Sequence, residues 1–168
     1  MPNVYGEGTP DAAGMRVAVV AALFNDQFTK ALCHGAVTTA RAHGVDDEAI
    51  DVFWVPGAFE IPLVAGELAA TGAYDAIACV GAVVRGETPH FDFVAGETAR
   101  GIMEVGRETG VPLGFGVITA DSLEQAAARS GGAVGNKGSE AMYAALAVAA
   151  LLRDAVAADV TGDEEDEG

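Results

Sequence analysis

The residue types best suited to chemistry gather in one short segment, VVRGETPHFDF, at residues 83–93. It follows a run of small apolar residues and contains Arg85, Glu87, His90 and Asp92. Histidine titrates near neutral pH and suits proton transfer, although a single histidine in a loop is more often an ordinary surface residue. Metal binding is a weaker alternative, because the spacing of Glu87, His90 and Asp92 matches no standard zinc motif. The residues alone leave a polar surface loop and a catalytic histidine both open.

The elements that must position this segment follow from the apolar pattern. Four nearly continuous apolar runs predict strands covered on both faces, at residues 15–23, 50–55, 74–84 and 112–119. Helical patterns alternate with them, at residues 27–43, 59–71, 91–109, a short stretch after Ser122 and a long one at about 138–158. This order predicts an α/β fold. We expect a three-layer αβα sandwich, flavodoxin-like, with a four-stranded parallel sheet flanked by helices on both faces.

Residues near the expected helix ends agree with these boundaries. Asn25 and Asp26 form a candidate capping pair at the start of the first helix, since Asn and Asp favour that position. Gly44, Gly72 and Gly110 follow the first three long helical patterns, where glycine commonly ends a helix. These residues at the expected helix ends support the predicted alternation of strands and helices.

Polar and aromatic residues follow several of the predicted strands. In an open parallel sheet, ligands bind at the carboxyl ends of the strands. Phe24 follows the first strand, Phe59 and Glu60 follow the second, and His90 lies in the loop after the third. Phe24 could be a core residue or could stack on a flat heterocycle. Glu60 could complement a helix dipole or accept hydrogen bonds from a ligand. Their convergence at one edge predicts a binding site.

Two cations stand beside a glycine-rich segment, GGAVGNKG at residues 131–138. The segment fails the phosphate-loop pattern G-x-x-x-x-G-K-[ST], because Asn136 and Gly138 occupy required positions. Arg129 and Lys137 flank it in an otherwise acidic chain, and arginine suits phosphate binding. A phosphorylated substrate is therefore one hypothesis. The alternative is that both cations only balance neighbouring acids.

Charge and composition limit the possible partners. The chain has 168 residues with 25 Asp and Glu against 9 Lys and Arg, a net charge of -16. Such a surface repels nucleic acid and anionic membranes, so we expect neither as a partner. Solubility and adaptation to high salt are both open explanations of this charge. The N-terminus lacks the features of a signal peptide and no run could span a bilayer, so we expect a cytoplasmic protein.

We expect one domain at residues 15–158, between a flexible arm at 1–14 and an acidic, disordered tail at 159–168. The two cysteines, Cys33 and Cys79, belong to no CxxC pair, so zinc and redox motifs are absent. Cys79 lies in an apolar run and is expected to be a small buried side chain.

Five motifs, in order and suitably spaced, resemble one known family: LFND, VPGAFEIP, GAVVRGETPHFDFV, FGVIT and GNKGSEAM. The chain resembles the lumazine synthases of riboflavin biosynthesis over roughly residues 15–155. This resemblance implies a transferase that condenses 5-amino-6-(D-ribitylamino)uracil with 3,4-dihydroxy-2-butanone 4-phosphate. It implies no metal and no organic cofactor, with catalysis largely by positioning and by proton transfer.

The resemblance also implies roles for individual residues. His90 would be the proton donor and Phe24 would stack on the pyrimidine. The residues implied to contact the pyrimidine, its ribityl chain or the ring are Ala58, Phe59, Glu60, Ala82, Val83 and Val84. Those implied to hold the phosphate are Glu87 and Thr88, through backbone groups, and Arg129. Phe115 would close the pocket from a neighbouring subunit, while Lys137 and Glu140 are secondary. Arg85 and Asp92 receive no role beyond structure.

The resemblance implies a homo-oligomer, a pentamer or a multiple of pentamers up to an icosahedral shell, with active sites at subunit interfaces. Two other functions stay open. One is an archaeal-type riboflavin synthase, which would use two lumazine molecules and no butanone phosphate. The other is a non-catalytic lumazine- or flavin-binding shell protein, although such a protein would have no need of His90 and Arg129.

Overall fold

The computed structural model describes residues 1–158, and the predicted acidic tail, 159–168, lies outside the described residues. At its centre is a four-stranded parallel sheet with the order β2-β1-β3-β4. The strands are β1 (Val17–Ala22), β2 (Ile50–Val55), β3 (Ala76–Val84) and β4 (Leu113–Ala120). The observed sheet confirms the predicted strands, and their ends differ from the predicted ones by no more than two residues.

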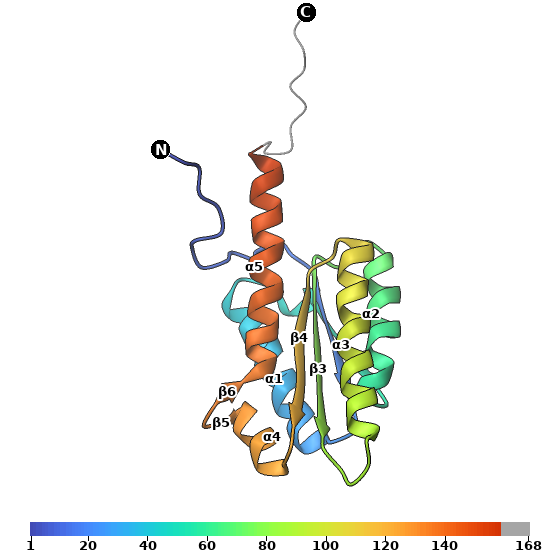
Figure 1. Ribbon diagram of the computed structural model, residues 1–168. Coiled ribbons are helices and arrows are strands. Elements are labelled where there is room, and N and C mark those ends of the chain that lie inside the picture. Colours follow the sequence, from blue (N-terminus) through green and yellow to red (C-terminus); the bar gives the residue numbers. More distant parts are fainter. Residues whose placement is uncertain (159–168) are drawn as a thin grey trace, which may run out of the picture.

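Helices cover both faces of the sheet, as Figure 1 shows. Helices α1 (Asp26–Ala42) and α5 (Lys137–Ala157) pack on one face. Helices α2 (Ile61–Ala70) and α3 (His90–Thr109) pack on the other. Short elements fill the connections: η1 (Asp47–Ala49), η2 (Ala58–Glu60), α4 (Leu123–Arg129), β5 (Ser130–Gly132) and β6 (Gly135–Asn136). The predicted three-layer αβα sandwich is therefore confirmed, and the small β5–β6 hairpin was not foreseen.

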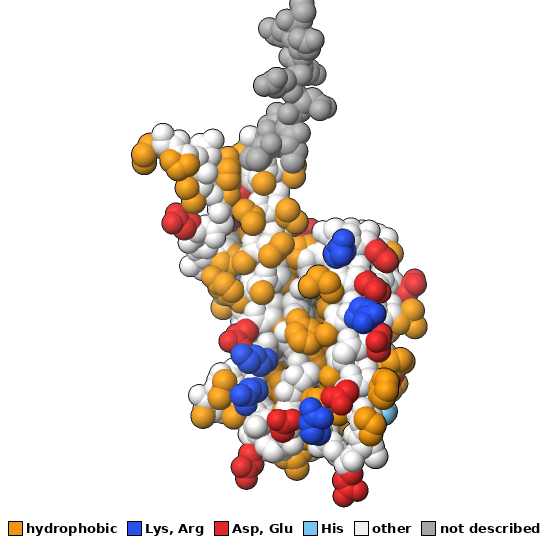
Figure 2. Space-filling view, in the orientation of Figure 1, with side chains coloured by type: hydrophobic (Ala, Val, Ile, Leu, Met, Phe, Trp, Pro, Cys, Tyr) orange, Lys and Arg blue, Asp and Glu red, His pale blue; other side chains and the backbone are white. Residues whose placement is uncertain are grey.

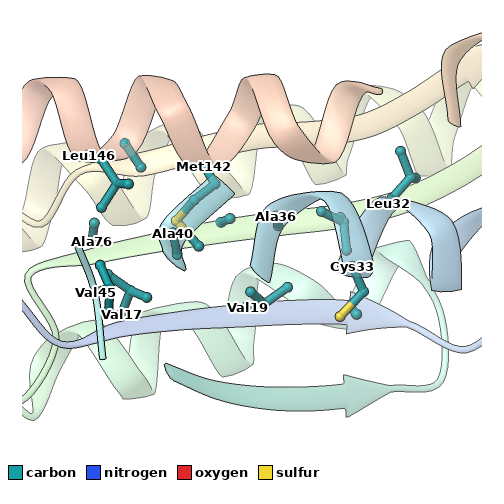
Figure 3. Packing of buried hydrophobic residues seen from close by; sticks show 14 of the residues in the cluster. Val17, Val19, Leu32, Cys33, Ala36, Ala40, Val45, Ala76, Met142 and Leu146 are labelled. Atoms are coloured by element: carbon teal, nitrogen blue, oxygen red, sulfur yellow. The ribbon is translucent and has the colours of Figure 1, made fainter. Parts of the chain in front are cut away.

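The two central strands form the buried middle of the domain. All six residues of β1 are buried, and their side chains alternate between the two helical layers. Figure 3 shows one of these clusters, where Val17 and Val19 of β1 meet Ala36 of α1 and Leu146 of α5. Small side chains such as Ala36 let the helices approach the sheet closely, as interior packing density requires.

The outer strands differ from the central ones. Strand β2 leaves Trp54 41% exposed and β4 leaves Phe115 48% exposed. Phe115 shares its hollow with the exposed side chains of Met103 and Leu152, and contiguous exposed apolar patches mark interfaces or ligand sites. On the face shown in Figure 2, hydrophobic side chains lie along α5 and beside β4. Both edges of the sheet thus present apolar surface.

The chain before β1 packs partly against the domain. Ala12 is fully buried, and its backbone N–H donates to the carbonyl of His43 at 2.8 Å. The guanidinium of Arg153 donates to the carbonyl of Asp11 at 2.9 Å. These contacts fasten residues 11–12 beside the end of α1 and α5. No helix in residues 1–158 is both long and apolar enough to cross a membrane.

Candidate active site

A pocket of about 790 Å³ opens at the carboxyl edge of the sheet. It lies at the end of the molecule where β3 leads into α3, the lower end in Figure 1. The segments just after β1 and β2, the end of β3 and the first turns of α3 form its wall. The residues of the sequence-based site that line it are Phe24, Ala58, Phe59, Glu60, Ala82, Val83, Val84, Thr88 and His90. Segments far apart in the sequence therefore meet at the edge where a parallel sheet binds ligands.

Three phenylalanines give the pocket its open aromatic surface. Phe24 is 72% exposed, Phe59 is 62% exposed and Phe93 is 69% exposed. Phe24 is therefore not a core residue, and its interpretation as part of the core is wrong. An uncovered ring in a pocket can stack on a flat ligand. Phe93 was not among the expected site residues, although its position three residues after His90 on a helix puts both on one face.

Asn25 shapes the loop between β1 and α1 in a way that the sequence reading missed. Its backbone is left-handed, with φ 62° and ψ 45°, and its side chain makes no capping hydrogen bond. Asn25 therefore occupies the predicted N-cap position of α1, but its side chain does not make the capping bond expected there. Instead, its side-chain amide donates to the carbonyl of Ala82 at 2.9 Å. This bond connects the loop between β1 and α1, which carries Phe24, to the end of β3. Asparagine tolerates the left-handed backbone better than most residues.

Glu60 lies at the start of α2, half-buried in the pocket wall. Its side chain makes no capping hydrogen bond to that helix. Its carboxylate is directed toward Gly57, where a Cβ would stand 3.4 Å from Oε1. The helix dipole still favours a negative charge here. Because no cap uses the carboxylate, its oxygens can accept hydrogen bonds from a ligand.

His90 is the first residue of α3 and is exposed at the pocket. Its backbone N–H donates to the hydroxyl of Thr88 in a long bond of 3.4 Å. Pro89 precedes it, so the chain turns sharply from the loop into the helix. The imidazole is thus presented at the pocket rim by a helix start, next to the backbone N–H groups that could hold an anion.

Five of the expected site residues do not line this pocket: Glu87, Phe115, Arg129, Lys137 and Glu140. Glu87 lies exposed in the loop between β3 and α3. Phe115 lies on β4 in a separate hollow of about 540 Å³, beside Met103 and Leu152. The pocket of a single chain is therefore formed without Phe115 and without the arginine expected to bind phosphate.

The two candidate cations have local partners. The guanidinium of Arg129 donates to the carbonyl of Gln125, one turn earlier in α4, at 3.1 Å. Lys137 forms an ion pair with Glu140 at 3.0 Å in the first turn of α5. Neither bond is strong or buried enough to prevent a phosphate from competing for the cation.

The GNKG segment is a junction between α1 and α5. The side chain of Asn136 accepts from the N–H groups of Gly138 and Ser139, at 2.9 and 3.1 Å, and so caps α5. It also donates to the carbonyl of Ala31 in α1 at 3.0 Å. A Cβ on Gly138 would stand 2.0 Å from the carbonyl oxygen of Leu32. These positions are explained by helix packing, and no phosphate loop is needed to account for them.

Thiol chemistry does not belong to this pocket. Cys79 is fully buried in β3, and burial raises its pKa to about 12. Burial also raises the pKa of Cys33 on α1. In residues 1–158 no three His, Cys, Asp or Glu side chains are grouped so that they could hold a metal ion. What the pocket offers is aromatic surface, the carboxylates of Glu60 and Glu97, backbone donors and acceptors, and an exposed imidazole.

Fold and pocket together define a flavodoxin-like α/β protein with a small-molecule site at the carboxyl edge of a parallel sheet. Its sequence matches the model of the 6,7-dimethyl-8-ribityllumazine synthase family over residues 14–153. That match covers most of the chain, so the chain belongs to the lumazine synthase family, whose members serve riboflavin biosynthesis. The resemblance inferred from the five motifs is confirmed.

Proposed function

We propose that this chain condenses 5-amino-6-(D-ribitylamino)uracil with 3,4-dihydroxy-2-butanone 4-phosphate to 6,7-dimethyl-8-ribityllumazine, releasing phosphate and water. Family membership supports the reaction class. The observation that carries the proposal is the meeting of His90, Glu60 and the exposed ring of Phe24 in one pocket. A flat pyrimidine, its hydrogen-bonding groups and a group that needs proton transfer match these three features.

The pyrimidine would lie against Phe24, with its polar edge toward the ends of β2 and β3. Ala58, Phe59 and Glu60 would contact the ring and the ribityl chain. Backbone groups of Ala82, Val83 and Val84 would complete the recognition of the ring, and the Ala82 carbonyl keeps a second lone pair beside its bond to Asn25. Recognition mainly by backbone and by a packed aromatic ring suits a reaction that depends on orientation.

The reaction would proceed in three stages, which are imine formation, loss of phosphate and ring closure. The amino group of the uracil attacks the ketone carbon and water leaves, which forms an imine. Proton loss from the butanone carbon and cleavage of the C–O bond then expel inorganic phosphate. The enol left by this elimination tautomerises to a ketone at the carbon that carried the hydroxyl, and the ribitylamino nitrogen closes the ring onto this new carbonyl, with loss of a second water. His90 would donate and accept the protons of these steps, because an imidazole can serve as a general acid and as a general base.

The phosphate would bind at the start of α3, through the backbone of Glu87 and Thr88. Arg129 would pair with it. Since neither Arg129 nor Phe115 lines this chain's own pocket, we assign both to the pocket of a neighbouring subunit. The active unit would then be a homo-oligomer, a pentamer or a multiple of it. The exposed Trp54 and Phe115 on the two sheet edges support such subunit contacts.

The test is to mix both substrates with the purified protein and to follow lumazine absorbance together with phosphate release. We expect His90→Ala to lower kcat by at least about 100-fold without changing the mass of the oligomer. We expect Arg129→Ala mainly to raise KM for butanone phosphate. His34→Ala is the matched control, because His34 is exposed on α1 and does not line the pocket.

Wild-type kinetics in both the His90 and Arg129 variants would reject the assigned roles. Riboflavin formed while lumazine disappears would identify the archaeal-type riboflavin synthase instead. Tight binding of lumazine without turnover would identify a binding or shell protein. Light scattering on the same samples gives the mass, and a fully active monomer would reject the shared site.

A further inference from the structure

Arg85 directly follows β3 and contacts two other segments near the pocket. Its Nε donates to Oδ1 of Asp121, just after β4, at 2.8 Å. Its Nη1 donates to Oδ1 of Asp92, in the first turn of α3, at 3.4 Å. Its guanidinium carbon lies 4.3 Å from the ring centroid of Phe91, a cation–π distance. One side chain thus contacts the segment after β4 and two residues of the helix that begins at His90.

These contacts place Arg85 directly behind the reactive part of the site. Phe91, whose ring Arg85 covers, lines the pocket beside His90. Asp121 precedes Ser122, whose hydroxyl caps α4, the helix that ends at Arg129. Arg85 therefore links the helix that presents the imidazole to the segment between β4 and α4.

Arg85 itself is not placed to bind substrate. It does not line the pocket, and two carboxylates already use its Nε and Nη1. The hydrogen bond that Arg85 donates to Asp121 raises the pKa of Arg85, so it stays charged throughout the physiological range. Only arginine can combine a planar face for an aromatic ring with donors in a fixed fork. A lysine could keep the charge but could not make both kinds of contact at once.

We propose that Arg85 is a positioning residue, which holds the first turn of α3 so that His90 and Phe91 keep their places at the pocket. The expected effect on kcat rests on the proposed function. The expected effect on the first turn of α3 rests only on the three contacts of Arg85. If Arg85 only stabilised the fold, its removal would lower the thermal midpoint and leave kcat unchanged. The side chains of Arg85, Asp92 and Asp121 are 45%, 63% and 67% exposed. Ion pairs this open add little to stability.

The first test compares Arg85→Met with wild type. Methionine keeps an unbranched stem but removes the charge and the fork. We expect kcat to fall about 10- to 100-fold, because a misplacement of about 1 Å near the chemistry has effects of this size. KM for both substrates should change less than about threefold, and the thermal midpoint by no more than about 4 °C. Arg85→Lys should recover part of kcat. Arg41→Met is the matched control, since Arg41 pairs with Asp47 away from the pocket.

Two further measurements keep the inference testable if Arg85→Met folds poorly or the wild-type protein lacks the proposed activity. Asp121→Asn leaves Arg85 in place but weakens its 2.8 Å bond to residue 121. This variant should also lower kcat, by severalfold. Amide hydrogen exchange needs no turnover, and it should speed up at residues 86–92 in Arg85→Met and Asp121→Asn but not in Arg41→Met.

The outcomes separate the two proposals. If wild type makes no lumazine, the proposed function fails, and exchange at residues 86–92 decides the role of Arg85 alone. Unchanged exchange in both the Arg85 and Asp121 variants overturns the positioning role. In an active enzyme, wild-type kcat in both variants overturns it as well.

Discussion

Gly138, in the first turn of α5, allows a backbone contact that no larger residue could make. A Cβ built on it would stand 2.0 Å from the carbonyl oxygen of Leu32 in α1, whereas ordinary van der Waals contact begins at 3.4 Å. Gly138→Ala must therefore separate the two backbones locally by about 1.4 Å, the difference between these distances. A backbone carbonyl inside a helix cannot rotate away as a side chain could, so α5 has to shift.

The energetic cost follows from what that shift disturbs. Met142 and Leu146, on the following turns of α5, are fully buried against α1 and the sheet. Overpacking of a buried contact costs about 1–3 kcal/mol, and the backbone clash puts this site at the upper end. Alanine returns up to about 1 kcal/mol through its higher helix propensity. We expect a net loss of about 2 kcal/mol, or about 4–8 °C in thermal midpoint.

Circular dichroism melting and urea unfolding at one fixed protein concentration would measure this loss. Gly96→Ala is the matched control, because Gly96 lies within α3 and an added Cβ meets no atom within 4 Å. That variant should be at least as stable as wild type, by up to about 1 kcal/mol. If Gly138→Ala melts at or above the wild-type temperature, the packing argument is refuted, and the glycine of GNKG needs another explanation.

Two other predictions concern charge. Hydrogen bonds from Tyr74 and Arg16 lower the pKa of Asp51, so its contribution to stability is complete above the usual aspartate pKa and is lost as pH falls through the lowered value. Asp51→Asn should therefore be less stable than wild type at pH 7, with a difference that shrinks below about pH 4 in urea unfolding; a difference constant with pH would contradict this. With a net charge of -16, we also propose adaptation to high salt: the thermal midpoint should rise with KCl up to molar concentration, and a flat or falling curve would reject it.

The sequence by itself was sufficient to predict the four strands of the sheet and the helices that alternate with them. Strands β1 and β3 are buried on both faces, so nearly every residue had to be apolar and the runs were easy to recognise. Helix ends were visible for a local reason as well. Gly44, Gly72 and Gly110 all have positive φ, of 100°, 73° and 72°, a backbone that glycine adopts without strain. The edge that carries the pocket followed from the parallel alternation alone.

Other features depended on contacts that no local pattern encodes. Asn25 looked like a helix cap, but its amide bonds to Ala82, which is 57 residues away. Asn136 and Gly138 break the phosphate-loop pattern, but the sequence did not say what they do instead, which is to serve the packing of α5 on α1. The role of Arg85 needed Asp121, which is 36 residues later in the chain. Asparagine, glycine and arginine each suit many structural tasks, so only the partners brought close by the tertiary fold could decide between them.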